Sequence, residues 1–99
     1  MKTIYKYVIN DTAVVAGIQN GKTLLLPVGS KILCCKLQNN KDICVWVELD
    51  PKVEEKEEFT FVLFGTGWPM ADLADANYEY VDTIMFDDGV FVYHVYRIK

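Results

Sequence analysis

Residues 59–70 read FTFVLFGTGWPM, and this stretch assigns the chain to the β class. It begins with β-branched and aromatic residues, which are typical of a strand. It then breaks at Gly65-Thr66-Gly67 and turns through Trp68-Pro69. Side chains alternate between the two faces of a strand, and here both sets are largely apolar, so we expect a strand covered on both sides. The first set is Phe59, Phe61 and Leu63, and the second is Thr60, Val62 and Phe64.

The rest of the chain repeats short β-rich runs separated by turn signals. A first strand is expected over Ile4–Ile9, and only Ala71–Ala76 tolerates a helix of one or two turns. Asn-Gly, Asn-Asn and Asp-Gly pairs tolerate positive φ and therefore predict tight hairpins. We predict one all-β domain over residues 1–99, a small antiparallel barrel or sandwich of seven to eight short strands. Hairpin turns are expected at Asn20-Gly21, Asn39-Asn40 and Asp88-Gly89. The first of these turns would connect strands over Ala13–Ile18 and Thr23–Leu26.

Two-residue loops in these hairpins fix which residues lie opposite each other. The second hairpin would place Cys35 opposite Cys44, a pairing that could support a disulfide in an oxidising compartment. The third would place Thr83 opposite His94 and Tyr80 opposite Arg97, with Asp82 close enough to pair with Arg97. Ile43 and Leu49 are expected to point inward, together with every second residue between them on the same strand. The predicted core is Ile4, Val8, Ile32, Val45, Val47, Phe59, Phe61, Leu63, Val92 and Val95.

Charge and composition exclude several classes of protein. The 99 residues are 52% hydrophobic with a net charge of −4, which argues against disorder. Residues 1–47 carry six lysines and two aspartates, whereas residues 48–88 carry twelve acids and two lysines. Such an acidic half is unsuited to direct nucleic-acid binding, because phosphate neutralisation supplies most of that affinity. No apolar run is long enough to span a membrane, and residues 1–11 lack the apolar block of a signal peptide, so we expect a cytoplasmic protein.

Cysteine and histidine usage gives no metal or redox site. Three cysteines, an odd number, fit a reducing compartment, and we expect all three to be free thiols. The single histidine and the absence of CxxC or HExxH spacing leave no metal site, and no cofactor is expected. His94 has no nucleophile in a recognisable elbow, and a hydrogen-bonded structural histidine is favoured over a general base. The sequence therefore predicts a protein that is not an enzyme.

Several motifs together resemble a family of short uncharacterised proteins of tailed phages and prophages. They are the MKTIYKY start, the Cys44-x-Trp46 strand leading into Leu49-Asp50-Pro51, the FGTGWP turn and the closing DDGVFVYHVY hairpin. Members similarly open with TIYKY, carry an FGTGxP turn and end in an aromatic hairpin. The resemblance covers most of the chain, although residues 10–29 are longer here. It implies a phage origin, with the bacterial cytoplasm as the place of action, and it supplies no activity.

The GTGW turn is the candidate ligand site. Glycine-flanked backbone N–H groups and the Thr66 hydroxyl could hold an anion, but the lysine and long helix of a P-loop are missing. The competing interpretation is a tight turn with glycine at positive φ and Trp68 packed on the core. As a site, the turn would offer Trp68 for stacking on a planar ligand. The predicted ligand-binding residues are Gly65, Thr66, Gly67, Trp68, Tyr93, His94 and Tyr96.

Three functions remain open at this point. A non-enzymatic accessory protein could antagonise a host defence by sequestering a small signal, such as one derived from a nucleotide, at the GTGW turn. This function predicts a concave pocket around Trp68. Alternatively, the acidic segments could occupy the basic groove of a host nucleic-acid-binding defence protein, as an anti-CRISPR-like inhibitor would, which predicts a continuous acidic surface. The third function is a structural or assembly protein of the virion. The aromatic content also predicts homo-oligomers.

Overall fold

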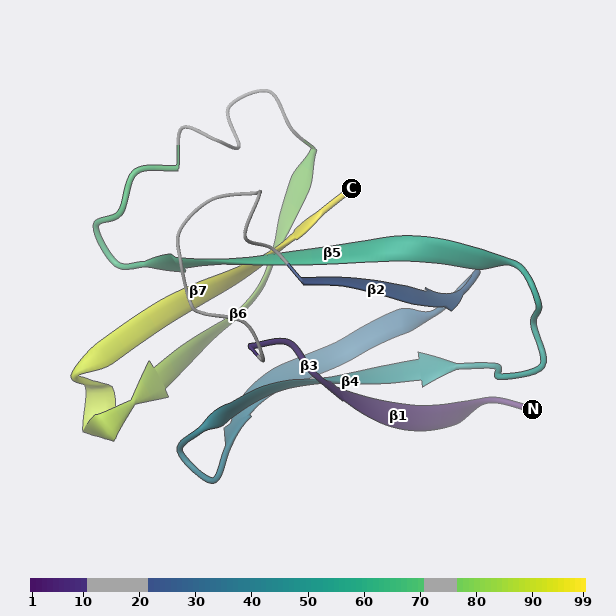
Figure 1. Ribbon diagram of the computed structural model, residues 1–99, viewed down its shortest axis with the longest axis horizontal. Coiled ribbons are helices and arrows are strands. Elements are labelled where there is room, and N and C mark those ends of the chain that lie inside the picture. Colours follow the sequence, from purple (N-terminus) through teal and green to yellow (C-terminus); the bar gives the residue numbers. More distant parts are fainter. Residues whose placement is uncertain (11–21, 71–76) are drawn as a thin grey trace.

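Seven strands form two antiparallel sheets in a computed structural model that describes residues 1–10, 22–70 and 77–99. The three-stranded sheet has the order β1-β4-β3, and the four-stranded sheet has the order β2-β5-β7-β6 (Figure 1). The strands are β1 (Thr3–Val8), β2 (Lys22–Pro27), β3 (Lys31–Gln38), β4 (Asp42–Leu49), β5 (Lys56–Gly65), β6 (Tyr78–Phe86) and β7 (Phe91–Ile98), with the 3-10 turn η3 (Asp87–Gly89) between the last two.

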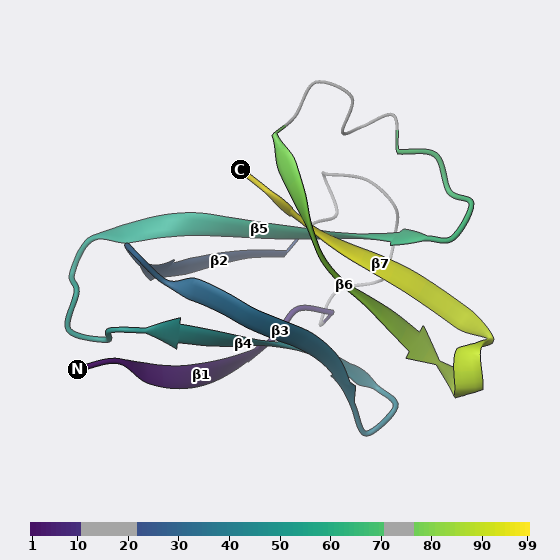
Figure 2. The same ribbon diagram turned by 180° about the vertical axis from the view of Figure 1, so that it is seen from behind.

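The sheets form a sandwich and not a closed barrel. Figures 1 and 2 show β2 and β5 on one side of the molecule and β1, β4 and β3 on the other. One core cluster draws buried side chains from both sheets, as a sandwich requires. The all-β prediction is confirmed. The expected features at Ala13–Ile18, Asn20-Gly21 and Ala71–Ala76 lie outside the described residues.

The core contains most of the predicted residues. Alternation along β4 buries Ile43, Val45, Val47 and Leu49, as predicted. The prediction that β5 is covered on both faces is also confirmed, because Val62 and Phe64 form a second buried cluster with Met70, Tyr96 and Ile98. The predicted core residues that are fully buried are Val45, Val47, Phe59, Phe61 and Val95. Ile32 and Leu63 are partly buried and pack against this core. Val8 and Val92 are half-buried.

The prediction that Ile4 is a core residue is wrong. In β1, Tyr5 lies opposite Val47, so the odd-numbered residues share the inward face of β4. Ile4 lies opposite Glu48 on the outer face and is 55% exposed. Alternation alone could not reveal this, because the face of an edge strand depends on its register with the neighbouring strand.

Two predicted registers are shifted by one residue. In the β3–β4 hairpin, Gln38 lies opposite Asp42, which places Cys35 opposite Val45 and Cys44 opposite Lys36. The connection is one residue longer than the two-residue loop that the prediction assumed. The predicted pairing of Cys35 with Cys44 is therefore wrong. All three cysteines are free thiols, as expected.

The β6–β7 hairpin confirms the prediction near its turn and departs from it further along. Thr83 lies opposite His94, as predicted. An irregularity at Val81 then shifts the register, so Arg97 lies opposite Glu79 and not opposite Tyr80. The expected ion pair between Asp82 and Arg97 is absent from the ion pairs of the described residues. Asp82 instead lies 3.4 Å from Lys36, and Arg97 lies 3.6 Å from both Glu57 and Glu79.

Candidate functional site

The end of β5 carries the GTGW turn, and its two glycines serve different purposes. The Trp68 N–H donates to the Gly65 carbonyl at 3.0 Å, which folds the indole back over Gly65. A Cβ atom at Gly65 would lie 2.6 Å from Cε2 of Trp68, so only glycine leaves room for the ring. Gly67 has a φ of +86°, a conformation that side chains disfavour. The predicted tight turn with glycine at positive φ is confirmed at this second position.

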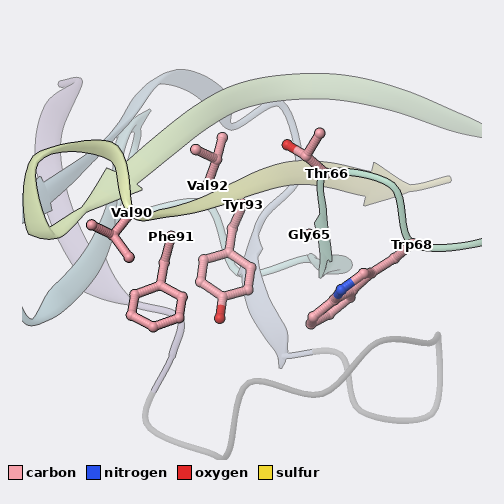
Figure 3. A pocket seen from close by; sticks show the side chains of 7 residues that line it. All are labelled: Gly65, Thr66, Trp68, Val90, Phe91, Val92 and Tyr93. Atoms are coloured by element: carbon pink, nitrogen blue, oxygen red, sulfur yellow. The ribbon is translucent and has the colours of Figure 1, made fainter.

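A pocket of about 210 Å³ opens beside this turn, between it and the start of β7 (Figure 3). Trp68 and Tyr93 meet edge to face, with ring centroids 5.8 Å apart. Phe86 also meets Tyr93 edge to face, with ring centroids 5.8 Å apart. The Trp68 side chain is 38% exposed, so part of the indole faces solvent at the pocket. The lining residues are Gly65, Thr66, Trp68, Val90, Phe91, Val92 and Tyr93.

Three polar groups of the turn are engaged within the protein. The Thr66 N–H donates to the Val92 carbonyl at 3.3 Å, and the Trp68 N–H is held by Gly65. The Thr66 hydroxyl lies 2.8 Å from Nε2 of His94. None of the described residues that line the pocket is a lysine or arginine. The pocket therefore lacks the positive charge that favours an anion, and the N–H groups of Thr66 and Trp68 are already used within the protein.

His94 and Tyr96 lie on the opposite face of β7 from Tyr93. Side chains alternate along this strand, and Val95 shares the inward face with Tyr93. Nδ1 of His94 lies 3.1 Å from the Thr83 hydroxyl, so both ring nitrogens contact threonines, which is the arrangement of a structural histidine. The structure thus brings together Trp68, Tyr93 and the turn. His94 contacts the turn through the Thr66 hydroxyl but does not line the pocket, and Tyr96 does not line it either. Tyr96 contacts Phe64, Tyr78 and Tyr80 edge to face.

Sequence reasoning missed Val90, Phe91 and Val92 as pocket residues and included Gly67, which does not line the pocket. Phe91 lies opposite Phe86 in the β6–β7 hairpin, but nothing in the sequence pairs β5 with β7. That pairing sets Gly65 opposite Tyr93 and brings the GTGW turn beside the first residues of β7.

A family model matches residues 1–99, the whole chain, and its description is "Domain of unknown function (DUF7352)". The chain belongs to the DUF7352 family. No curated protein and no solved structure matches this DUF7352 chain significantly.

The described residues of this DUF7352 domain offer few other sites for chemistry. Among residues 1–10, 22–70 and 77–99, no three His, Cys, Asp or Glu side chains lie together as metal ligands would. No helix in this part of the chain has the length and apolar character needed to cross a membrane.

The buried thiols of the DUF7352 domain are chemically protected. Burial, with a smaller contribution from Asp82, raises the pKa of Cys35 to about 12, and burial also raises the pKa of Cys44. The thiolate is the reactive form, so a raised pKa slows modification. Near neutral pH, we expect a thiol reagent to modify the partly exposed Cys34 first in the native protein. After denaturation without reductant, titration should count three thiols, whereas a count of one would reveal a disulfide.

Proposed function

We propose that this protein is a non-enzymatic binding protein whose ligand enters the pocket beside Trp68. The observation that carries the proposal is a concave, aromatic-lined pocket next to a partly exposed indole. The turn is held by hydrogen bonds on both sides of Gly67, so little ordering is required when a ligand binds. Pro69 restricts the backbone immediately after the indole.

The lining indicates the chemical class of the ligand. Trp68 and Tyr93 offer aromatic edges and faces suited to a planar group. The described lining residues include no lysine or arginine. The part of the ligand that enters the pocket is therefore neutral, and any phosphate of a nucleotide-derived signal stays outside. The resemblance to phage proteins supports a role in which the protein sequesters such a signal and thereby antagonises a host defence.

The alternative of an acidic inhibitor has less support. Several of the acidic side chains are neutralised by ion pairs within the protein. Glu79 is paired with both Arg97 and Lys99, and Glu57 is paired with Arg97. A surface that mimics nucleic acid would instead keep its negative charges unpaired and directed outward.

Replacing Trp68 with alanine tests the proposed site. We expect the wild-type protein, purified from bacteria that contain the signal, to retain a small molecule detectable by native mass spectrometry. Trp68→Ala should lose this ligand, because the stacking surface disappears, while the melting temperature changes little. Trp46→Phe is the matched control, because Trp46 lies on the other sheet, and it should retain the ligand. A Trp68→Ala protein that keeps the ligand contradicts the proposal, as does a wild type that carries none.

A further inference from the structure

The outer face of the three-stranded sheet carries a second, different hollow. It has a volume of about 350 Å³ and is lined by Ile4, Leu33, Cys34, Lys36 and Trp46. Ile4 is 55% exposed and Leu33 is 42% exposed. Leu33 lies at the register shift of β3, where it leaves the regular alternation of the strand. Several apolar side chains on an open sheet face are typical of a binding surface.

Lysines surround this hollow. Lys6 lies directly opposite Trp46 on β1, and its ammonium group donates to the uncharged Gln38 side chain at 2.7 Å, so its charge is not neutralised there. Lys31 is exposed at the start of β3. Lys36 lines the hollow but is paired with Asp82 of its own chain at 3.4 Å, so Lys6 and Lys31 supply the positive charge that a partner would meet. The partner that fits this face therefore combines an apolar anchor with negative charge.

The tip of the β6–β7 hairpin has that combination. Met85, Val90 and Phe91 are 60%, 72% and 52% exposed, and Asp87 and Asp88 lie between them in the sequence. Figures 1 and 2 show this tip projecting at the end of β6 and β7, away from the middle of the three-stranded sheet.

The tip is also held in place. The Asn40 side chain donates to Oδ1 of Asp87 at 3.0 Å and accepts from the Asp87 N–H at 3.3 Å. These bonds connect the tip to the β3–β4 turn of the same chain. A fixed apolar projection loses less conformational freedom on docking than a mobile loop would.

We propose that the β6–β7 tip of one copy docks in the lysine-rimmed hollow of a second copy. The hollow combines apolar side chains with lysines, and the tip combines apolar side chains with aspartates, so the two surfaces are complementary in charge. They are different surfaces of the chain, so the contact is head to tail, and each docked copy still presents one free tip and one free hollow. Association of this kind continues into a ring or a chain of subunits. The tip shares Val90 and Phe91 with the Trp68 pocket, but docking of the tip does not require a ligand there.

Two blocking substitutions test the head-to-tail contact. Leu33→Glu places a carboxylate in the hollow, and Met85→Lys places a cation on the tip; both side chains are exposed, so the fold should survive. Met85 does not line the Trp68 pocket, so ligand retention should persist in both variants. Leu25→Glu, on β2 where Leu25 is 66% exposed, is the matched control. Sedimentation velocity over a range of protein concentrations measures the assembly state.

We expect the wild type and Leu25→Glu to form species larger than a dimer, and each blocked variant to be monomeric. Mixing the two blocked variants should yield a 1:1 dimer, because one still has its tip and the other its hollow. Added salt should weaken the association. A monomeric wild type, or blocked variants that stay monomeric when mixed, would overturn the proposal. If the wild type is monomeric, quenching of Trp46 fluorescence by a single-stranded oligothymidylate, measured in a Trp68→Phe background, would assign the face to nucleic acid instead.

Discussion

Phe61→Ala is expected to lower the free energy of unfolding by about 3–5 kcal/mol, the cost of removing a buried phenylalanine ring. Phe61 is 1% exposed and lies on β5, an inner strand of its sheet, where it belongs to the core cluster that draws on both sheets. The cavity left by the ring would remove contacts on both sides of the sandwich. Chemical denaturation of the variant and the wild type measures the difference.

Phe91→Ala is the matched control for this substitution. Phe91 is 52% exposed at the start of β7, and its truncation should change stability by about 0.5 kcal/mol or less. Equal losses at the two positions would show that Phe61 does not contribute to the core in the way its burial indicates.

Gly65→Ala should displace the Trp68 indole and cost about 1–3 kcal/mol, the usual range for an added buried methyl group. The new Cβ atom would lie 2.6 Å from Cε2 and 2.9 Å from Nε1 of Trp68, closer than atoms can approach. The ring would have to leave the backbone and enter solvent. In a Trp46→Phe background, where Trp68 is the only tryptophan, its emission should shift to longer wavelength.

Gly67→Ala separates steric displacement from backbone strain. This glycine has a φ of +86° but no atom within 4 Å of an added Cβ, so the substitution should cost about 1–2 kcal/mol through strain alone. Trp68 emission should stay at its wild-type wavelength. The same red shift in both variants would mean that the turn as a whole, and not the space above Gly65, holds the indole.

Part of the candidate site could be predicted from the sequence. Trp68 and the glycines are neighbours in the chain, and the sequence predicts Tyr93 as a ligand-binding residue together with them. The alternation of side chains along a strand could also have excluded Tyr96 from the site. Tyr96 is an odd number of positions from Tyr93, so the two side chains point to opposite faces of the sheet. The contribution of Phe91 to the pocket could not be read from the sequence, because it depends on the pairing of β5 with β7.

The sequence by itself determined the β class and the main buried positions on β4 and β5. Both follow from local properties: β-branched and aromatic residues favour strands, and a period of two separates the faces. The tertiary structure alone decided the strand registers, which sheet face each edge strand presents and which aromatic residues meet at the pocket. A single added residue in the β3–β4 connection, or one irregularity at Val81, reverses which residues lie opposite each other. Such shifts hardly alter the preference of any residue for a strand. They are decided by the packing of the two sheets, which brings together strands that are distant in the sequence.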